Sequence, residues 1–214
     1  MKTLYRSLFA ASLLCLASCQ SVYYDVWESM GVEKRDILVD RVESARDAQE
    51  DAQETFSSAL EEFSSVVEFD GGNLEKLYNR LNNEYEDSQD AAEKVSDRIA
   101  RIDSVANALF SEWEDEIEEY TNPNFKRNST AQLRETRQRY AKLEQSLRKA
   151  EQSMQPVLAN MKDNVLYLKH NLNAQAIGAL RGEYQTIKRE IDTLIANMNA
   201  AIDSSDAFIA SMKN

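Results

Sequence analysis

Apolar side chains recur along this chain at alternating steps of four and three residues, in four long stretches. The stretches run over residues 38–66, 74–113, 133–168 and 177–212. A repeat of 3.5 residues keeps one face of a helix apolar along its whole length, and such faces pack together in coiled coils and elongated bundles. The pattern therefore predicts four long helices.

Turn-forming residues separate the four stretches. The segment DGGN at residues 70–73 predicts a tight turn followed by an N-cap, the polar residues 121–130 predict a loop, and NLN at 171–173 predicts a short break. Only five glycines and two prolines occur in the 214 residues, which favours long uninterrupted helices. We expect helices over residues 34–69, 74–120, 131–172 and 175–212.

Short connections between helices of this length make consecutive helices antiparallel. The sequence thus predicts an all-α protein, an elongated antiparallel four-helix bundle built from coiled-coil hairpins, with helices of roughly 55–70 Å. Folding the first hairpin about Gly71 and Gly72 places Ala52 opposite Ala92, where the two helices must approach closely. Pro156 lies inside the third helix, and we expect it to interrupt and bend that helix.

The first residues have the pattern of a signal peptide. Lys2 and Arg6 form a basic start, and the apolar stretch at 7–16 is shorter than the roughly 20 residues that a membrane-spanning helix needs. The segment LASC at 16–19 resembles the lipobox of bacterial lipoproteins, in which small residues precede a cysteine whose thiol accepts the lipid. An ordinary secretory signal that contains an accidental cysteine is the alternative.

The lipobox divides the chain into three parts. We expect residues 1–18 to be a lipoprotein signal peptide, 19–33 a lipid-anchored tether, and 34–214 the elongated helical domain. The resemblance implies that Cys15 leaves with the signal peptide and that Cys19 is the lipidation site, which would join the protein to membrane lipid. In lipoproteins of this class an Asp after the cysteine retains the protein in the inner membrane. Gln20 stands there instead, which implies the outer membrane, on its periplasmic face.

The tether contains a short aromatic segment. Tyr23, Trp27 and Met30 are spaced so that they would share one face of a helix. They are candidate membrane-interface contacts, because amphipathic rings are favoured at the level of the lipid headgroups. Alternatively, this segment packs on the base of the bundle, near Trp113 and Tyr120.

Charge excludes one class of partner and leaves two interpretations of the surface. The formal net charge is −12, so the chain is not suited to bind nucleic acid. The second hairpin should bring the basic segment 126–149 beside the acidic segment 112–119. The two segments either form ion pairs with each other, or the basic one is a docking strip for an anionic envelope partner.

Residues typical of catalysis are missing from the sequence. There is no glycine-rich phosphate loop, HExxH or GxSxG motif. The single histidine, His170, has Tyr167 where a di-iron bundle needs glutamate. The sequence therefore predicts no enzyme, no metal and no cofactor.

A structural role is the function that these observations favour. We expect a lipid-anchored, periplasm-facing envelope protein that acts as a spacer or in protein interaction, with an envelope protein or a second copy of the chain as partner. The alternative is a binding module that holds an apolar or lipid ligand between its helical hairpins.

Several long segments also resemble a known family. They are VYYDVWESMGVEKRDILVDRVESARDAQEDAQETFSSALEEF, FDGG, QLRETRQRY and LKHNLNAQAIGAL. In these segments the chain is similar to an uncharacterised family of Gram-negative bacterial lipoproteins, which carry domain of unknown function 2959 over nearly the whole mature chain. The resemblance implies a secreted, lipid-anchored helical protein. It implies no activity and no site residues.

Overall fold

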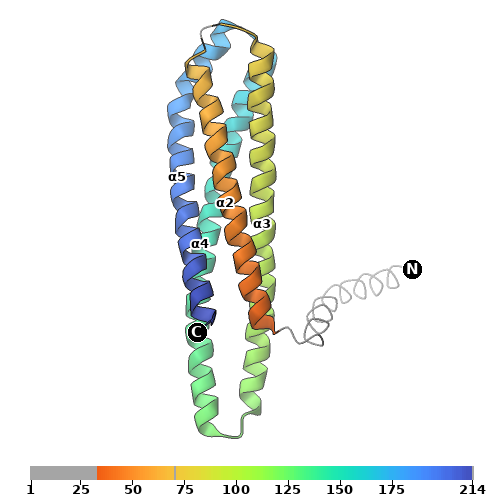
Figure 1. Ribbon diagram of the computed structural model, residues 1–214, viewed down its shortest axis with the longest axis vertical. Coiled ribbons are helices and arrows are strands. Elements are labelled where there is room, and N and C mark those ends of the chain that lie inside the picture. Colours follow the sequence, from red (N-terminus) through yellow and green to blue (C-terminus); the bar gives the residue numbers. More distant parts are fainter. Residues whose placement is uncertain (1–32, 70, 214) are drawn as a thin grey trace, which may run out of the picture.

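The structure is a computed structural model that describes residues 33–69 and 71–213. These residues form four helices, α2 (Lys34–Val67), α3 (Leu74–Glu119), α4 (Pro123–His170) and α5 (Ala174–Lys213). Consecutive helices run in opposite directions, and each helix packs against two neighbours, so that α2 also contacts α5 and closes the ring (Figure 1). The predicted all-α four-helix bundle is confirmed.

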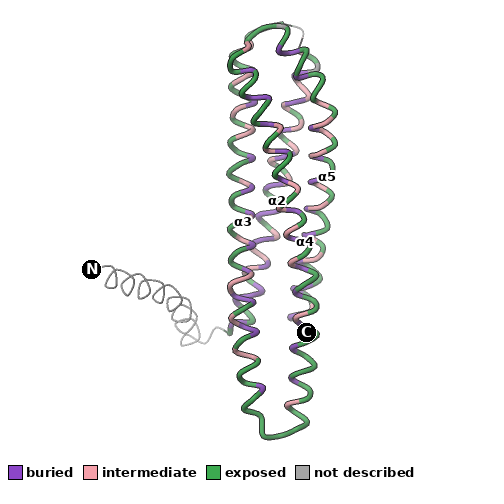
Figure 2. The backbone as a smooth tube through the Cα atoms, turned by 180° about the vertical axis from the view of Figure 1, so that it is seen from behind, coloured by how far each residue is buried: buried purple, intermediate pink, exposed green. Residues whose placement is uncertain are grey.

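The predicted seams form the core of this rod. Figure 2 shows buried positions recurring along every helix, with exposed positions between them. Along α2, the apolar seam residues are at most 1 % exposed: Leu38, Val42, Ala45, Ala52, Phe56, Ala59, Phe63 and Val66. The seams of the other helices are buried in the same way, apart from half-buried Leu74, Tyr78, Tyr85, Trp113 and Tyr184. The heptad spacing therefore identifies the inner face of each helix.

The turn between α2 and α3 has the predicted chemistry. Gly71 and Gly72 have φ angles of 142° and 138°, in the region that favours glycine. Asn73 then caps α3, because its side chain accepts a hydrogen bond of 3.1 Å from the backbone N–H of Lys76. Nearby, Arg181 of α5 donates a hydrogen bond to the backbone oxygen of Phe69. This bond ties the turn to the last helix.

An ion pair supports the predicted register of the first hairpin. Lys94 pairs with Asp51 at 2.6 Å, next to Ala52 and Ala92, both of which are buried. Small side chains at this level let α2 and α3 approach closely.

Helix α4 begins eight residues earlier than expected, and the prediction of a polar loop over residues 121–130 is wrong. Asn122 caps the helix by accepting a hydrogen bond of 2.9 Å from the N–H of Asn124, and Pro123 occupies the first turn. Proline is favoured there because its missing N–H would have no partner inside the helix. The turn between α3 and α4 is consequently very short.

Helix α4 also continues through Pro156, so the expected interruption is not found. Proline removes one backbone hydrogen bond from a helix. Pro156 itself is exposed, whereas the neighbouring Met154 and Val157 are fully buried in the core. Packing of these neighbours holds the helix together across the proline.

Unequal helix lengths give the rod two different ends. Helices α3 and α4 have 46 and 48 residues, against 34 in α2 and 40 in α5. The α3–α4 pair therefore extends beyond the start of α2 and the end of α5, as the lower part of Figure 1 shows. We call this end the tether end, the outermost residues 120–125 the hairpin tip, and the opposite end, with the other two turns, the far end.

Candidate functional site at the tether end

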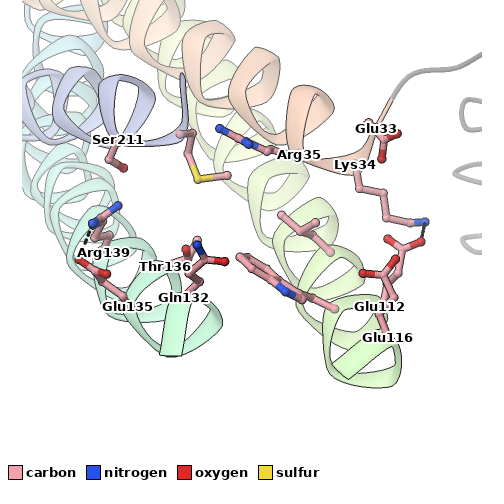
Figure 3. Close-up of a pocket in the computed structure, with 13 residues that line it drawn as sticks. Glu33, Lys34, Arg35, Glu112, Glu116, Gln132, Glu135, Thr136, Arg139 and Ser211 are labelled. Atoms are coloured by element: carbon pink, nitrogen blue, oxygen red, sulfur yellow. Dashed lines mark hydrogen bonds and ion pairs between the residues drawn. The ribbon is translucent and has the colours of Figure 1, made fainter. Parts of the chain in front are cut away.

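A cavity of about 650 Å³ lies at the tether end, where two helices stop and two continue. The first residues of α2 and the last residues of α5 form one side, and the inner faces of α3 and α4 form the other (Figure 3). Among the described helices, only α3 and α4 continue beyond this level, which leaves the space open. The chain thus enters the folded body beside a hollow.

The cavity has an apolar floor and a charged rim. Leu109, Trp113 and Met212 supply the apolar surface, and the indole N–H of Trp113 donates a hydrogen bond of 2.8 Å to the hydroxyl of Ser129. The remaining lining residues are polar: Glu33, Lys34, Arg35, Glu112, Glu116, Gln132, Glu135, Thr136, Arg139 and Ser211. Such a hollow suits a group with one apolar side, such as an aromatic ring.

Two ion pairs lie on the rim of the cavity. Lys34, which is 8 % exposed, pairs with Glu112 at 3.0 Å and holds the start of α2 against α3. Arg139 pairs with Glu135 at 2.5 Å along α4. The described residues that line the cavity include no histidine or cysteine, and its hydroxyl groups belong to Thr136 and Ser211.

The core beside the cavity is closed by aromatic rings. Phe110 and Tyr140 meet edge-on with ring centroids 5.5 Å apart, and Tyr140 and Phe208 do so at 6.3 Å. The guanidinium of Arg137 lies 5.3 Å from the centre of the Phe110 ring. These contacts join α3, α4 and α5 on the side of the cavity that faces the far end.

The basic and acidic segments of the second hairpin do lie side by side. Lys126 pairs with Glu118 at 2.8 Å, and Arg137 pairs with Glu114 at 2.5 Å. The hydrogen bond from Arg137 lowers the pKa of the Glu114 carboxyl. Ion pairing within the molecule, the first of the two interpretations of these charges, therefore takes place.

Every residue singled out by its position in the tether lies outside the described residues. This applies to Cys19, Tyr23, Trp27 and Met30. Of the two residues expected near the aromatic segment, Trp113 is in the cavity, whereas Tyr120 lies at the hairpin tip. The two residues are seven positions apart, or about 10 Å along the helix axis.

Two features of this end were missed from the sequence. The cavity depends on where four helices end relative to one another, and no local pattern encodes that. The hairpin tip, with Phe125, was hidden by the assignment of residues 121–130 to a loop. The pair Asn122-Pro123 could have revealed it, because an N-cap residue followed by proline is a common helix start.

Metal sites and membrane spans were also sought in the described ranges. No group of three or more His, Cys, Asp or Glu side chains there could hold a metal ion. Within the same ranges, no helix is both long enough and apolar enough to cross a membrane.

Comparison with known proteins gives a family and no activity. No curated protein matches the chain. The family model described as "Protein of unknown function (DUF2959)" matches residues 23–212, which include the aromatic segment of the tether and all four helices apart from Lys213. The chain belongs to this family.

Proposed function

We propose that this chain is a lipid-anchored outer-membrane protein that faces the periplasm, and that its rod acts as a spacer or protein-interaction scaffold. The observation that carries the proposal is where the chain enters the rod. Helix α2 begins at Lys34, at one end of the bundle, only 15 residues after Cys19. A lipid on Cys19 would therefore hold the rod by its end.

The dimensions and surface of the rod support this role. Helix α3 alone, with 46 residues, is about 70 Å long. Among the described residues, the exposed large apolar side chains lie towards the two ends: Tyr120 and Phe125 at the hairpin tip, and Leu166, Tyr167 and Leu172 near the far end. A rod with polar sides and apolar ends is suited to join two surfaces that lie apart.

The anchor is tested by substitution of the cysteines. Cys19→Ala should abolish incorporation of a radioactive fatty acid and leave the protein unprocessed or mislocalised, because the lipid-accepting thiol is gone. Cys15→Ala is the matched control and should be lipidated normally. Labelling of the Cys19→Ala protein would show that the lipobox assignment is wrong.

The scaffold role is tested by crosslinking in intact cells, followed by purification of the anchored protein. We expect an envelope protein or a second copy of this chain to be captured through photoreactive groups placed near Leu166 and Tyr167. Groups at Glu54 and Ala100, on the exposed sides of α2 and α3, are the controls. Capture from the sides alone would contradict contact through the far end.

A second candidate function is binding of an apolar or lipid ligand between the hairpins. The cavity at the tether end is the observation that favours it, since Leu109, Trp113 and Met212 offer apolar surface there. Native mass spectrometry of the purified protein separates the two functions. A small molecule that co-purifies and is lost in Leu109→Glu would favour the ligand; a bare chain or oligomer favours the scaffold.

A further inference from the structure

The hairpin tip exposes two aromatic rings at the outermost point of the rod. Tyr120, the C-cap of α3, is 43 % exposed, and Phe125, in the first turn of α4, is 60 % exposed. Their rings meet edge-on across the turn, with centroids 6.4 Å apart. Phe125 is the most exposed large apolar side chain in the part of the chain that the structure describes.

The tip holds these rings in fixed positions. Asn122 caps α4, Pro123 fixes the backbone of its first turn, and Lys126 donates a hydrogen bond of 2.8 Å to Glu118 across the hairpin. Removing an aromatic ring from water is favourable by about 25 cal/mol for each Å² buried. Because the two rings are not buried in the core, contact with an apolar partner would remove them from water and would be favourable by this amount per Å².

The tip points away from the bundle at the end of the rod where the tether joins α2. Lys34, the first residue of α2, is paired with Glu112, and Tyr120 follows Glu112 by eight residues, or about 12 Å along α3. Cys19 and Glu33 lie fourteen positions apart in the sequence, so the chain between them has fourteen residue steps. They span about 21 Å as a helix and up to roughly 48 Å when extended. In either form the tether is long enough to place its lipid level with the tip.

The charge near the tip indicates which kind of membrane surface the tip could contact. The last turns of α3 are strongly acidic, and two basic side chains, Lys126 and Arg127, directly follow the tip in the sequence. An anionic membrane would repel this end, whereas zwitterionic headgroups would not. Tyrosine and phenylalanine rings are favoured at the boundary between headgroups and acyl chains.

We propose that Tyr120 and Phe125 form a second membrane contact, in which the hairpin tip inserts its rings into the zwitterionic lipid surface that also holds the lipid of Cys19. This inference rests on the lipid anchor proposed above. It adds a point of contact within the folded rod itself. Two points of contact would hold the rod at a defined angle to the membrane.

The test places a fluorescent probe next to the rings. Thr121→Cys introduces one reactive thiol at an exposed position, since Cys15 is removed with the signal peptide and the thiol of Cys19 carries the lipid. The labelled, lipidated protein is reconstituted in vesicles of phosphatidylethanolamine and phosphatidylcholine that contain a brominated quencher lipid. We expect the probe to be quenched and its emission to shift to the blue.

Matched double variants separate the tip from the rest of the rod. Tyr120→Ser with Phe125→Ser should reduce the quenching several-fold, whereas Leu166→Ser with Tyr167→Ser, at the far end, should leave it unchanged. All four side chains are exposed, so both variants should keep the melting temperature of the parent. Quenching that is equal in the two double variants would overturn the proposal.

Flotation of the vesicles distinguishes failure of the tip contact from failure of the anchor. A protein that floats with the vesicles while its probe stays unquenched overturns the tip contact alone. A protein that carries no lipid and does not float overturns the anchor, and the tip contact with it. Energy transfer between labelled copies without quenching by lipid would assign the tip to a second copy of the chain and overturn the membrane contact.

Discussion

The hydroxyl of Tyr140 on α4 donates a hydrogen bond of 2.7 Å to the carboxylate of Asp103 on α3. Arg148, two turns further along α4, binds the other oxygen of the same carboxylate. Burial raises the pKa of the Tyr140 hydroxyl, and the bond to Asp103 raises it further. A neutral phenol, a carboxylate and a guanidinium thus form one polar cluster between two long helices.

Tyr140→Phe should lower the free energy of unfolding by about 1–3 kcal/mol, because it removes a hydrogen bond to a charged group in a half-buried place. Urea denaturation at neutral pH measures this change. Tyr167→Phe is the control, since Tyr167 is exposed and its ring is retained. An equal loss in both variants would contradict a role for the Asp103 bond.

The same cluster predicts how stability depends on pH. The pKa of Tyr140 is higher in the folded chain than the 10.0 of an unperturbed tyrosine, so the folded state retains a proton that the unfolded state loses. This contribution is fully present below pH 10 and is lost as the pH rises further. Between pH 9 and 11, the free energy of unfolding should therefore fall more steeply with rising pH in the parent than in Tyr140→Phe. Parallel curves would contradict the raised pKa.

Ala52→Leu should destabilise the first hairpin by about 1–3 kcal/mol through overpacking. Ala52 is fully buried where α2 and α3 approach closely, and a larger side chain forces the helices apart. Ala100→Leu, on the exposed face of α3, should change stability by less than about 0.5 kcal/mol. Chemical denaturation of both variants checks this, and unchanged stability of Ala52→Leu would remove Ala52 from the seam.

Gln49→Met is expected to stabilise the protein. Gln49 is fully buried in the seam, and neither polar atom of its side chain has a hydrogen-bond partner among the described residues. A buried polar group without a partner costs about 1–3 kcal/mol, which methionine of similar shape would recover. Gln53→Met, on the partly exposed side of α2, should have little effect. A less stable Gln49→Met protein would indicate that the amide has a partner such as bound water.

Trp113→Phe leaves Trp27 as the only tryptophan of the chain, because the sequence contains two. We expect its emission to be blue-shifted before any vesicles are added, since the apolar floor of the cavity lies beside the start of α2. The family match also begins at residue 23 and so includes this segment. Emission that shifts only when vesicles are present would instead place Trp27 in the membrane interface.

Much of the fold could be predicted from the sequence, because the spacing of a heptad seam alone identifies the face of each helix that is buried. Leu38, Phe56 and Leu147 are buried as their spacing requires. The start of α4 could not be located by composition, since Asn122 and Pro123 favour turns and helix starts alike. The cavity could not be predicted either, because it depends on the relative lengths of four helices that are far apart in sequence.

The place where α2 begins also decides how the rod would carry a mechanical load. If the proposed lipid on Cys19 anchors the chain, force applied through it would enter the bundle at Lys34, the start of α2. Because α2 packs against both α3 and α5, its contacts along 34 residues would be sheared together. Shear divides a load among many side chains at once, whereas peeling concentrates it on one pair at a time. With such an anchor, a membrane that moved away from a partner at the far end would load the contacts of α2 in shear rather than one after another.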